Sequence, residues 1–434
     1  MRSFLKIFAL ALTLALSLSI GCSDRGTNSG YIQEVEEGGM LVSPHIYFDE
    51  LFLQIRNPFQ VLGTKGYLPR VAYAPIYGGR GKPVPLLILL PPQGYDEHFY
   101  FDHGLMELAD ELIAKGEIQP MAILTISNDL VFGGYFYAGC SPGGDSSYTY
   151  FPNLPDTMTI AGTLHNPGSG DYDLLLGYSL PDYIRRALTF VIDDPSKWGI
   201  GGLGMGAYGA FRTVMLHPGV FTSVSAVDSP LDFDGADGNA GFETLFDDVI
   251  AEQALGGDLS AFDSSSALPL TQLFIGGSLA FSPHDTMVTL LAQRYMDRPA
   301  TINSMTRYVI TDSTTLVEDV IKADENNFDF HLPFDVSGNA YAPIWEDLWL
   351  PNNLENILPN STLDGVDIWI ATSAEAHFGY HEQTTSFIST LTGAGYAVNT
   401  LEYSGYDGSP ATFDRYVYDL MREMLIFHSE SFGE

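Results

Sequence analysis

The chain has 434 residues, 45% of them hydrophobic, so it is long enough to bury a large core without cross-links. Its 54 acidic and 19 basic residues give a formal net charge of −35. A field of that sign repels nucleic acid, which excludes nucleic-acid binding, and it favours binding of cations.

The N-terminus predicts an export signal. Arg2 and Lys6 precede an apolar run over residues 7–18, which is typical of a cleaved leader. The segment Ser19-Ile-Gly-Cys22 is similar to a bacterial lipobox, although Ser19 stands where leucine is preferred. We therefore predict a lipoprotein signal peptide over residues 1–21. The alternative is an ordinary secretory signal with an incidental cysteine.

Cleavage before Cys22 would leave a lipid-modified cysteine that holds the protein on a membrane. The acidic, polar stretch 22–40 is typical of a flexible tether. The predicted location is the bacterial cell envelope, outside the cytoplasm, on the periplasmic or surface face. With Cys22 modified, Cys140 is the only other cysteine, so no intramolecular disulfide is expected.

Beyond the tether, runs of aliphatic and β-branched residues alternate with segments of helical periodicity, which favours a mainly parallel sheet with crossover helices. Residues 41–73 predict antiparallel edge strands. The patterns predict strands at 86–90, 121–127, 199–203, 223–228, 366–372 and 398–403, and helices at 104–115, 179–191, 207–216, 383–393 and 413–427.

Two stretches look like insertions between these elements. Residues 141–173 are rich in Gly, Pro, Ser and Thr, and residues 230–358 are longer and mixed. Loops at the carboxyl ends of parallel strands surround the ligand site in such folds, so we expect both insertions to flank it.

The segment 198–211 reads as a short buried strand, a glycine-rich turn and a helix. Within it, Gly202-Leu-Gly204-Met-Gly206 matches the frame of the G-x-S-x-G nucleophile elbow, in which a sharp turn lifts a serine above the sheet. Gly204 holds the serine's position. Without a side chain it cannot form an acyl-enzyme.

Several segments around this turn resemble one family in their order along the chain. They are Val84-Pro-Leu-Leu-Ile-Leu-Leu, Ala109-Asp-Glu-Leu-Ile, Phe132-Gly-Gly-Tyr-Phe-Tyr, Met215-Leu-His-Pro-Gly-Val-Phe and Ser225-Ala-Val-Asp-Ser. Together they resemble the esterase branch of the α/β hydrolases that includes esterase D, feruloyl esterases and mycolyltransferases. The resemblance runs from about residue 71 to the C-terminus.

The resemblance implies one α/β-hydrolase domain over residues 41–434, with a mainly parallel sheet, helices on both faces and a large insertion after the strand that follows the elbow. It also implies a triad in the order nucleophile, acid, histidine. The acid position falls on Ala376, with Glu375 beside it, and the histidine position falls on Asp407. No histidine occurs between His381 and His428. Nucleophile and base are therefore both missing, and the acid is in doubt.

The remaining part of such a site is its oxyanion donors. The resemblance puts these on the backbone amides of Met205 and of the Pro91-Pro-Gln93-Gly94 loop. Because Pro92 has no N–H, Gln93 is the predicted donor.

Substitute chemistry has three weaker candidates. Cys140 is a thiol nucleophile only with a partner such as His165 or His103, and the alternative is an inert, buried cysteine. His377 and His381 have the i, i+4 spacing of a helical metal pair, with Glu375 or Glu382 as a further ligand. The alternative is a solvated or satisfied pair of histidines.

Calcium is the third candidate. Asp232, Asp234 and Glu243 occupy positions 1, 3 and 12 of a calcium-type loop. The loop lacks an acid at position 5, and Asp237 stands where glycine is required, so an acidic surface turn is the alternative. No other cofactor is predicted.

The sequence thus predicts a lipid-anchored, catalytically degenerate esterase-like protein that binds an acyl or glycan ligand or acts at the cell envelope. The alternative is a carboxylic-ester hydrolase or acyltransferase that uses non-standard catalytic residues. We expect Gly204 at the tip of a turn with positive φ, and Glu375 and Asp407 facing the same cleft.

Overall fold

The computed structural model describes residues 46–47, 70–74, 83–95, 97–126, 136–140, 166–188, 190–234, 241–255, 262, 268–282, 306–310, 316–320, 331–335, 337–404 and 410–433. The contacts divide the chain into residues 1–36 and 37–434, and every described residue belongs to the second unit. Within the described residues, no helix is both long and apolar enough to cross a membrane.

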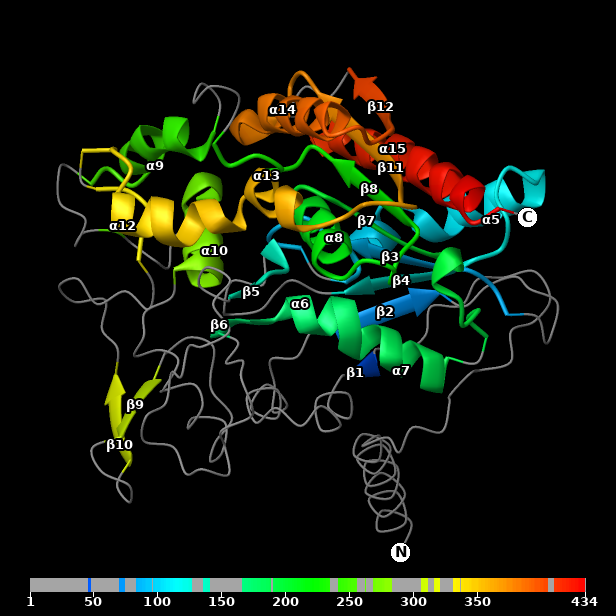
Figure 1. Ribbon diagram of the computed structural model, residues 1–434, viewed down its shortest axis with the longest axis horizontal. Coiled ribbons are helices and arrows are strands. Elements are labelled where there is room, and N and C mark those ends of the chain that lie inside the picture. Colours follow the sequence, from blue (N-terminus) through cyan, green and yellow to red (C-terminus); the bar gives the residue numbers. More distant parts are fainter. Residues whose placement is uncertain are drawn as a thin grey trace, which may run out of the picture. The chain divides into compact units, whose positions relative to one another are not determined.

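The centre of the fold is an eight-stranded sheet (Figure 1). Its strands are, in spatial order, β1 (Ile46–Tyr47), β2 (Arg70–Ala74), β4 (Ala122–Ile126), β3 (Leu86–Leu90), β7 (Trp198–Leu203), β8 (Ser223–Val227), β11 (Asp367–Ser373) and β12 (Val398–Tyr403). All neighbours from β4 to β12 pair in parallel, and β1 and β2 are antiparallel at the edge. The predicted parallel strands and the antiparallel edge are therefore confirmed.

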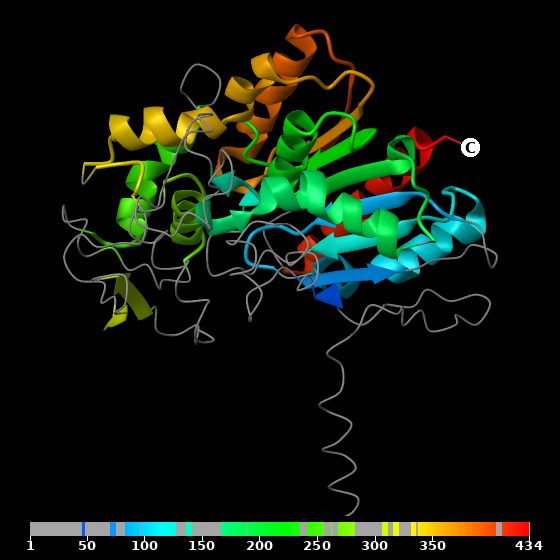
Figure 2. The ribbon, with the colours of Figure 1, turned by 60° about the horizontal axis from the view of Figure 1, so that its bottom comes forward.

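Helices cover both faces of this sheet, as the sequence predicts (Figure 1, Figure 2). In β3, Leu86, Ile88 and Leu90 point to one core while Leu87 and Leu89 point to the other, because successive side chains of a strand alternate between faces. The first core includes α7 (Leu180–Ala187), α8 (Met205–Leu216) and α14 (Tyr380–Gly393), and the second includes α4 (Phe99–Asp102), α5 (Leu105–Lys115) and α15 (Pro410–Ser431).

The predicted helix over 179–191 differs from the structure. α7 ends at Ala187, and it is preceded by α6 (Tyr172–Leu174) and a π-helical turn, η5 (Leu175–Ser179). α14 and α15 also begin three residues earlier than predicted. The further short elements are η6 (Pro195–Lys197), the antiparallel pair β5 (Gly139–Cys140) and β6 (Asn166–Asp171), and the antiparallel pair β9 (Thr306–Ile310) and β10 (Leu316–Val320).

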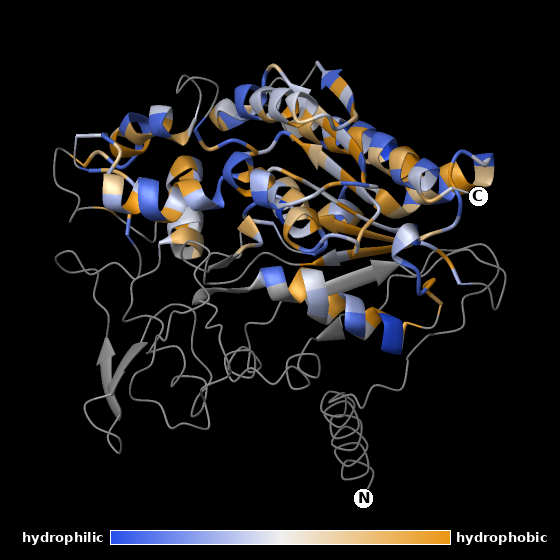
Figure 3. Cartoon of the chain, viewed as in Figure 1, coloured by the Kyte–Doolittle hydropathy of each residue, from blue (hydrophilic) through white to orange (hydrophobic). Residues whose placement is uncertain are grey.

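The described part of segment 230–358 is mostly helical. It contains η8 (Phe242–Leu245), α9 (Phe246–Glu252), α10 (Pro269–Phe281), α12 (Ala342–Ile344), η10 (Trp345–Trp349), η11 (Leu350–Asn352), α13 (Leu354–Ile357) and η12 (Leu358–Asn360). Its aromatic side chains share the α8 core: the Phe233 ring stacks on Tyr208 at a centroid distance of 5.3 Å. The Tyr208 hydroxyl also donates to the Asn352 carbonyl oxygen at 2.7 Å. Hydrophobic residues gather on the strands and on the helix sides that face them (Figure 3).

Candidate functional site

Gly204 forms the tip of a tight turn between β7 and α8. Its backbone angles are φ 54° and ψ −124°, so the predicted positive φ is confirmed. The Gly204 amide donates to the Val227 carbonyl oxygen at 2.9 Å, and the Ser229 hydroxyl donates to the Gly204 carbonyl oxygen at 2.7 Å. The turn therefore has the strand–elbow–helix geometry, fixed from both sides by the end of β8.

Two further glycines let α8 approach the sheet closely. A Cβ on Gly206 would overlap the Leu90 carbonyl oxygen, and a Cβ on Gly202 would lie 2.5 Å from the Gly206 carbonyl carbon. These neighbours are backbone atoms, which cannot rotate away. The Gly-x-Gly-x-Gly spacing is thus explained by packing around the elbow as well as by the turn itself.

The Gln93 side chain borders the position that the side chain of a nucleophile would take at the elbow. A Cβ on Gly204 would stand 3.2 Å from Gln93 Oε1 and 3.9 Å from the Asp228 carbonyl oxygen. Met205 is the first residue of α8, and the first amides of a helix have no acceptor within the helix. Of the two predicted oxyanion donors, Met205 therefore follows Gly204 directly, and Gln93 has its side chain beside Gly204. That their amides hold an oxyanion stays a prediction.

Tyr380 and Gln383 present polar groups from the buried face of α14. Tyr380 is 5% exposed, and burial raises the pKa of its hydroxyl, against a smaller opposing effect of the Gln93 side chain. Gln383 is fully buried, and its Nε2 donates to the Phe378 carbonyl oxygen at 3.1 Å. Neither the Tyr380 hydroxyl nor Gln383 Oε1 has a hydrogen-bond partner of ordinary geometry among the described residues.

A polar group that the sequence analysis missed lies beside the elbow, at the end of β8. Asp228 has a backbone φ of 38°, a conformation that residues other than glycine rarely adopt. Its Oδ1 accepts from the Ser373 amide at 2.7 Å, and its Oδ2 accepts from the Tyr416 hydroxyl. Burial raises the pKa of the Asp228 carboxyl, and this effect outweighs the two hydrogen bonds, which lower the pKa.

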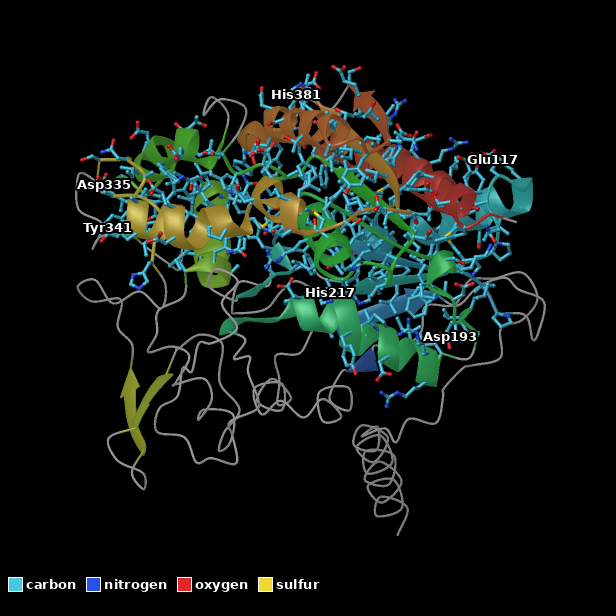
Figure 4. The ribbon with its side chains drawn as sticks, viewed as in Figure 1. Glu117, Asp193, His217, Asp335, Tyr341 and His381 are labelled. Carbon is cyan, nitrogen blue, oxygen red and sulfur yellow. The ribbon has the colours of Figure 1, made fainter. Side chains whose placement is uncertain are left out.

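Thr372 and His381 extend this group. The Thr372 hydroxyl lies 3.3 Å from His381 Nδ1, and both residues interact electrostatically or by hydrogen bonding with the Asp228 carboxylate. Figure 4 shows His381 on α14. The only signal in the sequence was an acidic residue at the end of the predicted strand over 223–228, the strand that follows the elbow.

The predicted acid lies on a turn at the end of β11. Glu375 is exposed, and its Oε2 accepts from the Ser373 hydroxyl at 2.7 Å. Ala376 donates its amide to the Ser373 carbonyl oxygen at 3.0 Å. Asp407 lies outside the described residues. That Glu375 and Asp407 share a cleft therefore stays a prediction.

The helical spacing predicted for His377 and His381 is wrong. Phe378 has φ 59° and Gly379 has φ 68°, so the chain leaves the helical conformation between the two histidines. His377 is exposed before the break, whereas His381 and the exposed Glu382 lie in the first turn of α14. The described residues contain no group of three or more His, Cys, Asp or Glu side chains that could hold a metal ion.

The calcium-type loop is described only at its ends. Asp232 is 1% exposed, and its Oδ1 accepts from Asn353 Nδ2 at 3.0 Å and from the Asp234 amide at 3.2 Å. Burial raises the pKa of the Asp234 and Glu243 carboxyls. Residues 235–240, with Asp237, lie outside the described residues, and calcium binding stays a prediction.

The cysteine candidates also fall largely outside the described part of the chain. This holds for Cys22, for His165 and for the side chain of Cys140, whose backbone forms β5. His103 is described: its Nδ1 lies 2.7 Å from the Phe99 carbonyl oxygen, and its Nε2 lies 3.4 Å from the Asp414 carboxylate.

No protein-family model and no curated protein matches the chain. Among solved structures, it is similar to a ferulic acid esterase at 13% identity, with 91% of this chain and 99% of the other covered and a TM-score of 0.46. An S-formylglutathione hydrolase from Agrobacterium tumefaciens is 14% identical, with 93% and 99% covered and a TM-score of 0.46. MPT51 from Mycobacterium tuberculosis is 11% identical, with 82% and 92% covered and a TM-score of 0.39. At these identities and TM-scores the likeness assigns neither a family nor a function to the chain. The chain has a mainly parallel sheet with helices on both faces and a glycine at the tip of the turn between β7 and α8.

Proposed function

We propose that this chain is an esterase-like protein of the cell envelope, anchored by lipid on Cys22, that binds an acyl or glycan group at its elbow without hydrolysing it. The observation that carries the proposal is Gly204. It stands at the tip of an intact elbow, where acyl transfer requires a hydroxyl or thiol. The amide of Met205 remains available to a carbonyl oxygen, so binding is retained while covalent catalysis is lost.

Ester turnover tests this proposal. The purified chain from Ser23 onward is incubated with p-nitrophenyl acetate and p-nitrophenyl butyrate, and nitrophenol release is followed. We expect no release above that from the heat-denatured protein, since no nucleophile stands at the elbow. A kcat of about 1 s⁻¹ or more, within the ordinary range of enzymes, would overturn the proposal.

The anchor has its own test. Cells fed an alkyne-tagged fatty acid should label the wild-type protein, and Cys22→Ser should remove the label and leave an unprocessed precursor. A Cys140→Ser variant serves as the matched control and should label normally. Equal labelling of wild type and Cys22→Ser would contradict lipidation at this residue.

A second candidate function, hydrolysis through non-standard residues, is favoured by Asp228. Its strained backbone borders the elbow, and its carboxylate is held by Ser373 and Tyr416 at the same edge of the sheet. Burial raises the pKa of this carboxyl, as is common for general bases. In this reaction Asp228 would take a proton from a water that attacks the ester carbonyl, and would return it to the departing alkoxide. Ester and water would give acid and alcohol.

This alternative has a direct check. Any turnover by the wild type should be abolished by Asp228→Asn and unchanged by Asp364→Asn, a matched change at an exposed residue. Turnover that survives Asp228→Asn would reject Asp228 as the base.

A further inference from the structure

The elbow is covered by a side chain of the protein itself. Gly204 is buried, and the partly exposed Gln93 side chain lies over it, with Oε1 3.2 Å from the position of a Cβ on Gly204. A serine placed at this elbow, or a ligand bound to it, would meet the Gln93 carboxamide first. The covering group is therefore a carbonyl oxygen.

This oxygen lies at the N-terminal end of α8, a helix of twelve residues. The first amides of a helix have no acceptor within the helix and carry a partial positive charge, which attracts carbonyl and carboxylate oxygens. The oxygen atom of the Gln93 carboxamide is thus placed where the N-terminal amides of α8 attract an oxygen atom.

The Tyr380 hydroxyl is an independent indication that a polar group of a ligand binds beside Gln93 at the elbow. Its side chain is 5% exposed, and its hydroxyl lacks a hydrogen-bond partner of ordinary geometry among the described residues. A buried hydroxyl is normally hydrogen-bonded. The hydroxyl interacts with the Gln93 side chain, which favours its ionised form as an amide N–H donor would. The Gln93 carboxamide therefore neighbours both Tyr380 and Gly204.

We infer that the Gln93 carboxamide is a built-in occupant of the elbow, and that it stands in for the uncharged carbonyl group of an ester or amide ligand. The ligand displaces the Gln93 side chain, places its carbonyl oxygen at the N-terminal end of α8 and accepts a hydrogen bond from Tyr380. This inference rests on the proposed function, since an elbow with a working nucleophile would cleave an ester rather than hold it.

The charge of the protein favours an uncharged ligand over a carboxylate. The backbone of Asp228 borders the Cβ position of Gly204, and its carboxylate is held by Ser373 and Tyr416 at the same edge of the sheet. The chain as a whole carries a formal net charge of −35. Both repel a second carboxylate, whereas an ester or amide carbonyl brings no net charge.

Binding of three small probes tests the inference: butyramide, methyl butyrate and butyrate, titrated by ligand-observed NMR against the chain from Ser23 onward. Gln93→Ala should bind butyramide and methyl butyrate at least about tenfold more tightly than the wild type, since the competing carboxamide is gone. Adding Tyr380→Phe should remove most of that gain. Gln272→Ala, a matched change at a half-buried glutamine of α10, should bind like the wild type.

Three results would overturn the inference: equal affinity of Gln93→Ala and wild type, an equal gain for butyrate, or a gain that survives Tyr380→Phe. Gln93→Ser repeats the test if Gln93→Ala proves unstable. The same spectra report hydrolysis of methyl butyrate. Formation of butyrate by the wild type would overturn the proposed function. The affinities of the wild type and of Gln93→Ala for butyramide would still test the role of Gln93.

Discussion

At the scale of single residues, Gly204 decides what the elbow can do. Its φ of 54° is free of strain for glycine and strained for any other residue. A Cβ at this position would also press against Gln93 Oε1, at 3.2 Å. We predict that Gly204→Ser alone is destabilised by about 1–2 kcal/mol and gains no ester turnover, because an unassisted hydroxyl is a poor nucleophile. Urea unfolding and nitrophenol release measure the two effects.

Restoring a full triad is the sharper residue-scale experiment. Gly204→Ser combined with Ala376→Asp and Asp407→His supplies a nucleophile, an acid and a base at the positions that the family resemblance implies. We expect turnover well above that of any single change, since triad members act as a unit. The matched control carries Gly204→Ala in place of Gly204→Ser. If the serine triple variant folds and is no faster than this control, the elbow does not support a triad built at these three positions.

The sequence predicted some of these residues and not others. Gly204 followed from a motif of local spacing, which a strand, a turn and a helix preserve in three dimensions. Asp228 did not, because its partner Tyr416 is 188 residues away and only the packing of α15 brings the two together. The Gln93 side chain over Gly204 was also beyond prediction. The sequence analysis assigned a role to the Gln93 amide, and side-chain direction depends on the surrounding packing.

At the scale of elements, close packing of α8 on the sheet depends on glycine. We predict that Gly206→Ala costs about 3 kcal/mol or prevents folding, because its Cβ would overlap the Leu90 carbonyl oxygen and neither backbone can move aside. Gly393→Ala is the matched control. It lies in α14 with nothing within 4 Å of its Cβ position, so it should stabilise the protein by up to about 1 kcal/mol. Thermal unfolding of the two variants with similar midpoints would contradict this account of the elbow.

The docking of α15 on β7 and β8 should depend on pH through His428. This histidine is fully buried, with Nδ1 2.7 Å from the Ser223 hydroxyl and Nε2 2.8 Å from the Ser225 hydroxyl. Burial lowers its pKa from 6.5 to about 3. Between about pH 6.5 and pH 3, His428 is therefore protonated in the unfolded chain and neutral in the folded chain. Protonation favours the unfolded chain in this range, so the free energy of unfolding decreases as the pH falls from 6.5 to about 3.

The expected loss is up to about 1.4 kcal/mol per pH unit, or about 2 kcal/mol between pH 7 and pH 5. Urea unfolding at the two pH values measures it, and His428→Gln should lack this part of the loss. His377→Gln, at an exposed position, should keep it. The same pH dependence in wild type and His428→Gln would show that the imidazole is not held neutral in the folded state.

The predicted elements match the structure best where hydrophobic periodicity is strong. Strand β3 has the predicted bounds because a buried parallel strand reads as a short apolar run. Strand β12 also has the predicted bounds, although it is a partly exposed edge strand with alternating polar residues. The helix around residue 180 was mispredicted at its start. There the chain forms a π-helical turn, and the His217 ring of the segment after α8 fills the space beside Gly177. Such a contact between distant segments has no local pattern.

At the scale of the whole molecule, the formal net charge of −35 should oppose compaction by self-repulsion. We predict that the unfolding temperature rises by a few degrees between about 10 and 150 mM NaCl, as the Debye length falls from about 30 to 8 Å. Differential scanning calorimetry in the two buffers checks this. An unfolding temperature that is unchanged or falls would show that attractive ion pairs outweigh the repulsion.

The central claim is that an intact elbow stands here without a nucleophile. The most direct measurement is intact-protein mass spectrometry of the chain from Ser23 onward after incubation with a fluorophosphonate. We predict an unchanged mass for the wild type, because Gly204 offers no hydroxyl to phosphonylate. A stoichiometric adduct on a hydroxyl beside the elbow would contradict the account and identify the nucleophile that it denies.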